Sequence, residues 1–237
     1  VSKFSLHLLR NLLHLGGQFG WFFAISVIPL AEVFAIEFTT PMWAAILAMV
    51  FLGERPRRTS LAAIGLGFVG ILIILRPGFQ EIGVPTLGVL AAAMAYATTY
   101  VLTKYLGRTD SPLAIIFYMT IIQLPLALAA SVVVHPAESS WSWPEPALWP
   151  WIVVVGVTAL SAHYCAARAL YLADATVVVP IDFLRLPLIA LVGLALYGET
   201  IDIWVIAGGV VIFTGTFLNV RSAAGAARSA AKGGKQS

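Results

Sequence analysis

Apolar runs of about 20 residues recur along this chain, with short polar breaks between them. A helix of that length crosses the hydrocarbon core of a bilayer, because each residue adds about 1.5 Å of rise. The chain has 237 residues, of which 60% are hydrophobic and only 11% are charged, so an ordinary soluble domain is excluded. The sequence therefore predicts an all-α polytopic membrane protein. The predicted transmembrane helices cover residues 11–28, 31–53, 59–76, 84–104, 112–134, 148–171, 175–197 and 202–221.

The basic residues are distributed unevenly between the two ends of these eight predicted helices. The sequence has 14 Lys and Arg residues, and with the N-terminus inside, all except Arg76 and Arg185 fall on or near the cytoplasmic side. This distribution follows the positive-inside rule. The net charge of +3 is thus a topology signal, and no nucleic-acid partner is expected. We expect both termini in the cytoplasm, an external loop over 135–147 and a disordered cytoplasmic tail over 222–237.

Two stretches of the chain resemble each other. An offset of 145 residues places Phe51-Leu-Gly-Glu54 on Leu196-Tyr-Gly-Glu199, and it places Glu37 on Asp182. Each copy contains a proline-bearing predicted helix that ends in Gly-Glu and is followed by a glycine-rich one. Internal repeats of this kind are typical of secondary transporters, in which the substrate site lies between the copies near the bilayer midplane.

The two copies differ in length. Two further predicted helices, 84–104 and 112–134, precede the matched part of the second copy, and no counterparts precede residue 11. We therefore expect upstream sequence to supply two more helices. Five helices in each half would place the second copy upside down relative to the first, as a ten-helix inverted repeat. The expected domains are residues 1–78 for the first repeat, which lacks its first two helices, and 79–221 for the second.

The motifs of both copies resemble the EamA domain of the drug/metabolite transporter superfamily. They occur in the same order in each copy, as Pro29-Leu-Ala-Glu32, Pro41, Phe51-Leu-Gly-Glu54 and Gly65 to Gly78, then as Arg168-Ala-Leu-Tyr171, Pro187 and Gly198-Glu199. The resemblance covers nearly the whole chain. It implies a secondary transporter that moves a small metabolite or drug-like solute across the inner membrane by alternating access. We expect the direction to be export, and the sequence leaves the solute unidentified.

Three charged side chains within predicted helices are candidates for the substrate site. Burying Asp or Arg at a helix centre costs about 2.5–3.5 kcal/mol on insertion scales, so such residues need a reason. Glu37 and Asp182 lie at matching depths, and Arg185 shares a helix face with Asp182 at a spacing of three residues. We predict that all three line a central cavity, where one cation between two acids leaves a carboxylate free for a substrate cation or a proton. The alternative is a salt bridge that only fixes helix packing.

Other polar side chains extend this candidate site. His14, Gln18 and Trp21 have spacings of four and three residues, which place them on one helix face. They are predicted to line the same cavity, or else to pack against polar neighbours. His163 and Tyr164 lie in the middle of a predicted helix and are further cavity candidates. The alternative for His163 is a hydrogen-bonded packing residue.

Prolines occupy near-equivalent places in the two copies. Pro41 and Pro187 both interrupt a predicted helix, and we predict that they act as kinks for gating. Helix distortion without motion is the alternative. No set of His, Asp and Glu residues has the spacing of metal ligands, so no metal site and no cofactor are predicted.

Two other functional classes are compatible with a polytopic membrane protein. The first is a truncated or partner-completed membrane subunit without independent transport. The second is a membrane enzyme acting on lipid-borne substrates, which is disfavoured because the sequence shows no acid/base or metal cluster near the interface. The expected partners are membrane lipid and a small-molecule solute. Proton coupling through Glu37 or Asp182 and assembly into a homodimer are left open.

Overall fold

The computed structural model describes residues 3–28, 30–76, 83–134, 144–197 and 203–233, and all regular elements in this part of the chain are helices. In chain order they are α1 (Phe4–Ile25), α2 (Leu30–Glu37), α3 (Thr40–Leu47), the π-helical turn η1 (Ala48–Leu52), α4 (Arg58–Leu75), α5 (Val84–Leu106), α6 (Pro112–Val134), the 3₁₀ turn η2 (Pro146–Leu148), α7 (Trp149–Leu172), α8 (Ala175–Val178), the 3₁₀ helix η3 (Val179–Leu184), α9 (Arg185–Tyr197) and α10 (Ile203–Gly233). The all-α fold class is confirmed.

Within these described residues, five helical segments are long and apolar enough to cross a membrane. They are Val33–Leu52, Val84–Leu106, Pro112–Ala130, Pro146–Leu172 and Ile203–Ala226. Each coincides with a predicted transmembrane helix to within a few residues at most boundaries. The spans predicted at 11–28, 59–76 and 175–197 stay predictions.

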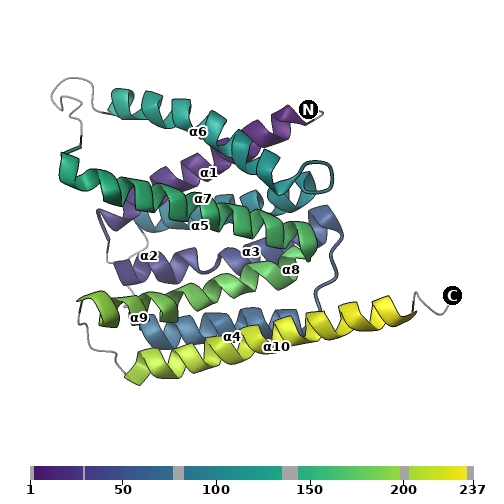
Figure 1. Ribbon diagram of the computed structural model, residues 1–237. Helices are drawn as coiled ribbons and strands as arrows, with labels where there is room; N and C mark the ends of the chain where they lie inside the picture. The colour runs from purple at the N-terminus through teal and green to yellow at the C-terminus, as the bar shows by residue number, and fades with distance from the viewer. Residues whose placement is uncertain (1–2, 29, 77–82, 135–143, 198–202, 234–237) are drawn as a thin grey trace.

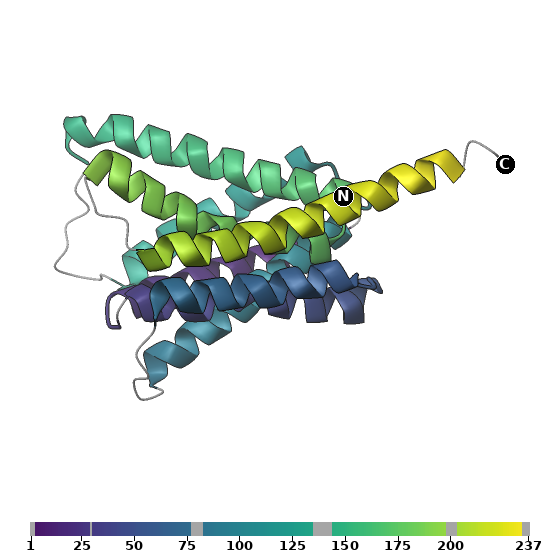
Figure 2. The same ribbon diagram turned by 90° about the horizontal axis from the view of Figure 1, so that it is seen from below.

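The long helices lie side by side in one bundle (Figures 1 and 2). In Figure 1, α1 begins and α10 ends at the right-hand end of the bundle. The connections from η1 to α4, from α5 to α6 and from α7 to α8 lie at that same end. Arg55, Arg57 and Arg108 belong to two of these connections, so one end of the bundle is enriched in basic residues.

The antiparallel pair of α4 and α10 packs closely through small residues (Figures 1 and 2). A Cβ added to Gly70 would overlap the backbone carbonyl of Gly208, and one added to Gly215 would crowd α4. Near the other end of α4, Ser60 donates a hydrogen bond to Oδ1 of Asn219 at 2.8 Å. Small residues thus allow two backbones to approach closely, as is usual between membrane helices.

The helix α10 continues past residue 221, where the sequence analysis ended its last span. The predicted disorder is wrong for residues 222–233, which are helical, while 234–237 lie outside the described residues. This stretch is rich in alanine, the strongest helix former. It is also anchored at its start, because Arg57 donates to the carbonyl oxygen of Ser222 at 2.9 Å.

Two of the predicted helices are discontinuous in the structure. The one predicted at 31–53 is interrupted after Glu37 by a turn at residues 38–39, and the one predicted at 175–197 contains the 3₁₀ helix η3. Under the offset of 145 residues, Phe38 at the first interruption corresponds to Phe183 in η3. The two breaks therefore fall at equivalent positions in the repeat.

Proline chemistry explains the first break. Pro41 has no backbone N–H, so the carbonyl of Glu37 loses the partner that a continuous helix would give it. The hydroxyl of Thr40 donates to that carbonyl at 2.6 Å instead. Pro41 and Pro187 both lie in the first turn of a helix, α3 and α9, where proline is tolerated. Both prolines therefore lie next to a distortion of the helical path, and their role in gating stays a prediction.

Candidate functional site

A cavity of about 390 Å³ lies between α1, α5 and α7 and the two interrupted helices. Most of the sequence-predicted site residues line it, namely His14, Gln18, Trp21, Glu37, His163, Asp182 and Arg185. Tyr164 does not, because it is one residue beyond His163, about 100° further around α7, and its side chain is exposed. The structure thus brings together residues from both copies of the repeat.

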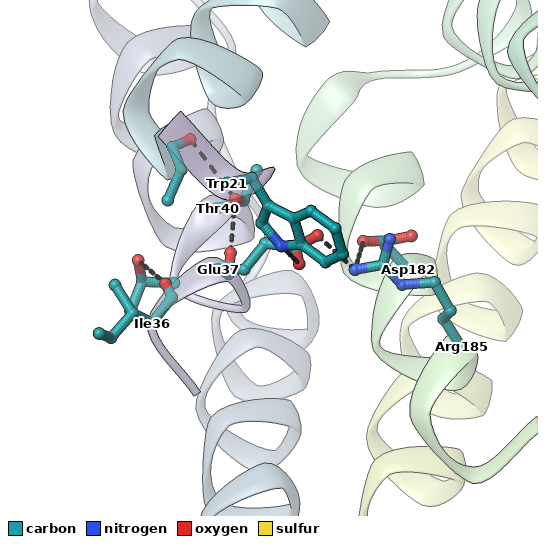
Figure 3. A network of polar contacts seen from close by, with 8 residues as sticks. Trp21, Ile36, Glu37, Thr40, Asp182 and Arg185 are labelled. Atoms are coloured by element: carbon teal, nitrogen blue, oxygen red, sulfur yellow. Dashed lines mark hydrogen bonds and ion pairs between the residues drawn. The ribbon is translucent and has the colours of Figure 1, made fainter. Parts of the chain in front are cut away.

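The three predicted charged residues meet at the two breaks (Figure 3). Nη2 of Arg185 lies 2.5 Å from Oε1 of Glu37 and 3.8 Å from Oδ2 of Asp182. The second oxygen of Glu37 accepts a hydrogen bond from the indole N–H of Trp21 at 2.7 Å. Glu37 is therefore held on both oxygens, whereas the carboxylate of Asp182 is more loosely paired.

The better-bonded acid is also the more deeply buried one. The side chain of Glu37 is 10% exposed, compared with 32% for Asp182 and 40% for Arg185. The guanidinium of Arg185 also lies over the ring of Phe38, with Cζ 5.0 Å from the ring centroid. The arrangement provides one well-bonded acid, one cation and one acid with free acceptor capacity facing the cavity.

Two aromatic rings, one from each interrupted helix, contact each other next to this charged group. Phe38 and Phe183 are each 1% exposed, and their ring centroids are 6.1 Å apart. They are equivalent residues under the repeat offset, so the two copies contact each other through the same position. This contact fixes the distance between the two interrupted helices, and with it the distance between their acids.

The polar face of α1 extends further than the sequence predicted. Arg10, one of the basic residues expected on or near the cytoplasmic side, lines the cavity and is 3% exposed. Its Nε donates to Oγ1 of Thr103 at 2.8 Å, and its Nη1 donates to Oδ1 of Asn11 at 3.1 Å. The missed signal was periodicity, because positions 10, 14 and 18 share one helix face with spacings of four.

The cavity wall on α5 was also missed. Tyr96, Thr99, Tyr100 and Thr103 all line the cavity, at spacings of three and four residues. The same periodicity could have found this face, but Thr and Tyr carry no charge and are common in membrane helices. On α7, the imidazole of His163 faces that of His14, with ring centroids 5.2 Å apart.

Glu54 connects the two repeats. It belongs to the Gly-Glu pair that was predicted to end a helix, and Gly53 ends η1 with a φ of 69°. The carboxylate of Glu54, however, accepts the backbone N–H groups of Ala175 at 2.9 Å and Thr176 at 3.0 Å. It thereby caps α8 and ties the first repeat to the second. The matching Gly198-Glu199 lies outside the described residues.

The chain is similar to known transporters over nearly all of its length. It matches the EamA-like transporter family over residues 2–76 and 84–221. It is 30% identical over 232 residues to the riboflavin transporter of Brucella anthropi, covering 97% of this chain and 81% of that protein. It is 29% identical over 200 residues to the riboflavin transporter of Vibrio cholerae, covering 84% of this chain and 65% of that one.

A third relative has another named solute. The S-adenosylmethionine uptake transporter of Rickettsia bellii is 26% identical over 224 residues, covering 94% of this chain and 74% of that protein. A protein of known crystal structure has the same fold, with a TM-score of 0.75 at 19% identity over 91% of this chain and 76% of that one. The family is one of multi-pass membrane transporters, which contact lipid and a small-molecule solute, and this disfavours an enzyme. This chain belongs to the EamA-like transporter family, within the drug/metabolite transporter superfamily.

Proposed function

We propose that this protein is a secondary transporter that carries a heteroaromatic solute of vitamin size across the inner membrane by alternating access, with riboflavin as the first candidate. The observation that carries the proposal is the meeting of Glu37, Asp182 and Arg185 at two helix breaks beside a polar cavity. Discontinuous helices at a repeat interface form the substrate sites of many secondary transporters. Charged side chains retained in a membrane bundle are by default candidates for such a site.

Packing between the repeats supports alternating access. Under the repeat offset, α4 and α10 are counterparts of each other. Gly70 of α4 contacts Gly208 of α10, and the counterparts of these two residues, Gly215 and Ala63, also contact each other closely. A contact and its image under the offset are expected where an approximate two-fold axis relates two inverted halves. Such symmetry gives a carrier two related conformations that open to opposite sides.

The cavity suits a planar ring. Its volume of about 390 Å³ falls in the range of small-molecule sites, and Trp21, Tyr96 and Tyr100 offer aromatic surfaces. Aromatic rings stack on such surfaces, while the hydroxyls of Thr99 and Thr103 can bind polar groups. Riboflavin and S-adenosylmethionine, the named solutes of the relatives, each contain a planar nitrogen heterocycle and hydroxyl groups.

The direction of transport is a separate part of the proposal. Export was expected from the sequence, whereas the S-adenosylmethionine relatives are named uptake transporters. We propose uptake on that basis, and the same assay measures export when the solute is loaded inside.

Transport in reconstituted vesicles tests the function. We expect purified protein to give saturable uptake of radiolabelled riboflavin and, as alternating access requires, accelerated exchange when unlabelled riboflavin is inside. Protein-free vesicles give the background, and Arg55→Gln, an exposed change outside the cavity, is the matched control. An imposed pH gradient tests proton coupling. Absence of saturable movement of riboflavin and of S-adenosylmethionine in both directions would contradict the proposal.

Cysteine accessibility tests the proposed topology, with both termini cytoplasmic. Thr109, between α5 and α6, and Glu145, directly before η2, are both exposed. The connection from α5 to α6 and the start of α7 lie at opposite ends of the bundle (Figure 1). In a Cys165→Ser background, an impermeant maleimide added to intact cells should label Glu145→Cys and spare Thr109→Cys. The reverse pattern would overturn the orientation.

A further inference from the structure

Arg10 is a buried cation whose described partners are all neutral. It lines the cavity with only 3% of its surface exposed, and no described acid lies within ion-pairing distance of it. Its two described hydrogen bonds go to the hydroxyl of Thr103 and the amide oxygen of Asn11. A guanidinium has five N–H donors, so most of its hydrogen-bonding capacity remains available to the cavity.

Arg185, the other arginine at the cavity, is paired with acids, in contrast to Arg10. Arg185 has two carboxylates near its guanidinium, at 2.5 and 3.8 Å. An arginine kept in a membrane bundle without such a partner is costly, and the cost is recovered when an acceptor of suitable geometry binds. The unpaired cation therefore indicates a group that comes with the solute.

The neighbours of Arg10 do not supply that group. Asn11 Oδ1 is already shared with the side-chain amide of Gln123 at 2.9 Å. The same amide of Gln123 lies 3.2 Å from Nδ1 of His14, whose ring faces His163. We name Arg10, His14 and His163 the basic pole of the cavity. Glu37 is bonded to Trp21, which lies 11 residues, or about 16 Å of helix rise, after Arg10 on α1. Asp182 lies beside Arg185, the ion-pair partner of Glu37.

We propose that Arg10 binds a planar edge of the solute that carries two acceptor atoms side by side. The rigid fork of a guanidinium matches such an edge, which a lysine ammonium cannot do. Two chemical groups provide it, a carboxylate, as in an amino-acid moiety, and the edge of a flavin-like ring at which a carbonyl oxygen lies next to an unprotonated ring nitrogen. The proposal rests on the proposed transport function for the choice of solutes, and it adds the orientation, with the acceptor edge at the basic pole.

Binding to detergent-purified protein tests the role of Arg10. Riboflavin fluorescence and Trp fluorescence report binding of riboflavin, S-adenosylmethionine and benzoate, the last being a minimal carboxylate. We expect Arg10→Lys to weaken binding of the edge-bearing ligand roughly tenfold, because it keeps the charge and loses the fork. Arg10→Gln should weaken it at least as much, and Arg55→Gln should bind like the wild type.

The three ligands distinguish the two sources of the edge. Weakening confined to riboflavin assigns the carbonyl and ring-nitrogen edge of the flavin, whereas weakening of S-adenosylmethionine and benzoate assigns a carboxylate. If an Arg10 variant does not fold, Thr103→Val removes the hydroxyl that orients Nε and should weaken the same ligands. Arg10-dependent binding of benzoate without transport of either solute would uphold the site and reject the proposed function. Wild-type affinity in all these variants, or no binding by the wild type, would overturn the inference.

Discussion

Under the repeat offset of 145 residues, α2–α3 and η3–α9 occupy equivalent places, and each is interrupted beside a carboxylate that a phenylalanine follows. Glu37 corresponds to Asp182, and Phe38 corresponds to Phe183. Three residues after each acid the copies differ, because Thr40 in the first corresponds to Arg185 in the second. The two phenylalanines contact each other at the junction between the repeats. Arg185, which has no charged counterpart in the first copy, supplies the positive charge there.

The two differing side chains bond in different directions. Thr40 satisfies a backbone carbonyl of its own repeat, whereas Arg185 reaches across the junction to the acid of the other repeat. Two equivalent acids thereby become unequal, one held on both oxygens and the other loosely paired. The bonds that Arg185 and Trp21 make to Glu37 thus leave Asp182 as the acid with spare binding capacity.

The largest effect is expected from the shared aromatic pair. Phe38→Ala and Phe183→Ala should each lower the free energy of unfolding by about 3–5 kcal/mol, because both rings are fully buried. The double variant should cost less than the sum by about 0.5–1.5 kcal/mol, the coupling of the lost ring contact. Reversible SDS titration measures these values. Strongly unequal single effects would contradict an equivalent role for the two residues.

The second largest effect is expected from removing the positive charge of Arg185. Arg185→Met leaves Glu37 without its ion-pair partner, so we expect a loss on the order of 3 kcal/mol in stability, together with loss of transport. Combining it with Asp182→Asn removes one unpaired acid, and should restore folded yield more than transport. Arg185→Lys is the control that keeps the charge. Full recovery of both yield and transport in the double variant would favour a purely structural salt bridge.

Much of this comparison follows from sequence. The repeat offset paired Glu37 with Asp182, and the spacing of three residues placed Arg185 beside Asp182, as the structure shows. The all-α fold follows from composition, because apolar runs of this length have few other solutions. What local patterns determine was therefore predictable from the residues alone.

Features that depend on distant partners were not predicted. The sequence assigned Arg10 only to the cytoplasmic side, and its place at the cavity follows from packing against α5, where it bonds Thr103. The two prolines indicated which helices are interrupted, but not which residues form the breaks, because a proline in an apolar run is equally compatible with a kink. Whether the chain kinks or breaks depends on a partner for the freed carbonyl, which Thr40 provides here.

The unequal pairing of the acids predicts unequal sensitivities. Glu37→Gln should cost about 1–2 kcal/mol, because it weakens charge-assisted bonds to Arg185 and Trp21. Asp182→Asn should cost less than about 0.5 kcal/mol, since its contact at 3.8 Å is longer and more exposed. Unfolding titrations give the ranking, and Trp21 fluorescence should change only in Glu37→Gln. The opposite ranking would show that Asp182 is the better-bonded acid.

The smallest effect is expected at Thr40, the counterpart of Arg185. Thr40→Val keeps the shape and removes the hydroxyl, so the carbonyl of Glu37 loses its partner, at a cost of about 1 kcal/mol. Thr40→Ser keeps the hydroxyl and should stay close to the wild type. In a Pro41→Ala background, the new N–H can bond that same carbonyl, so Thr40→Val should then cost clearly less. Unfolding titrations of the four proteins in this cycle measure the difference. An equal cost of Thr40→Val in both backgrounds would mean that the hydroxyl does not replace a helical bond lost to proline, and that Thr40 stabilises the break by another contact.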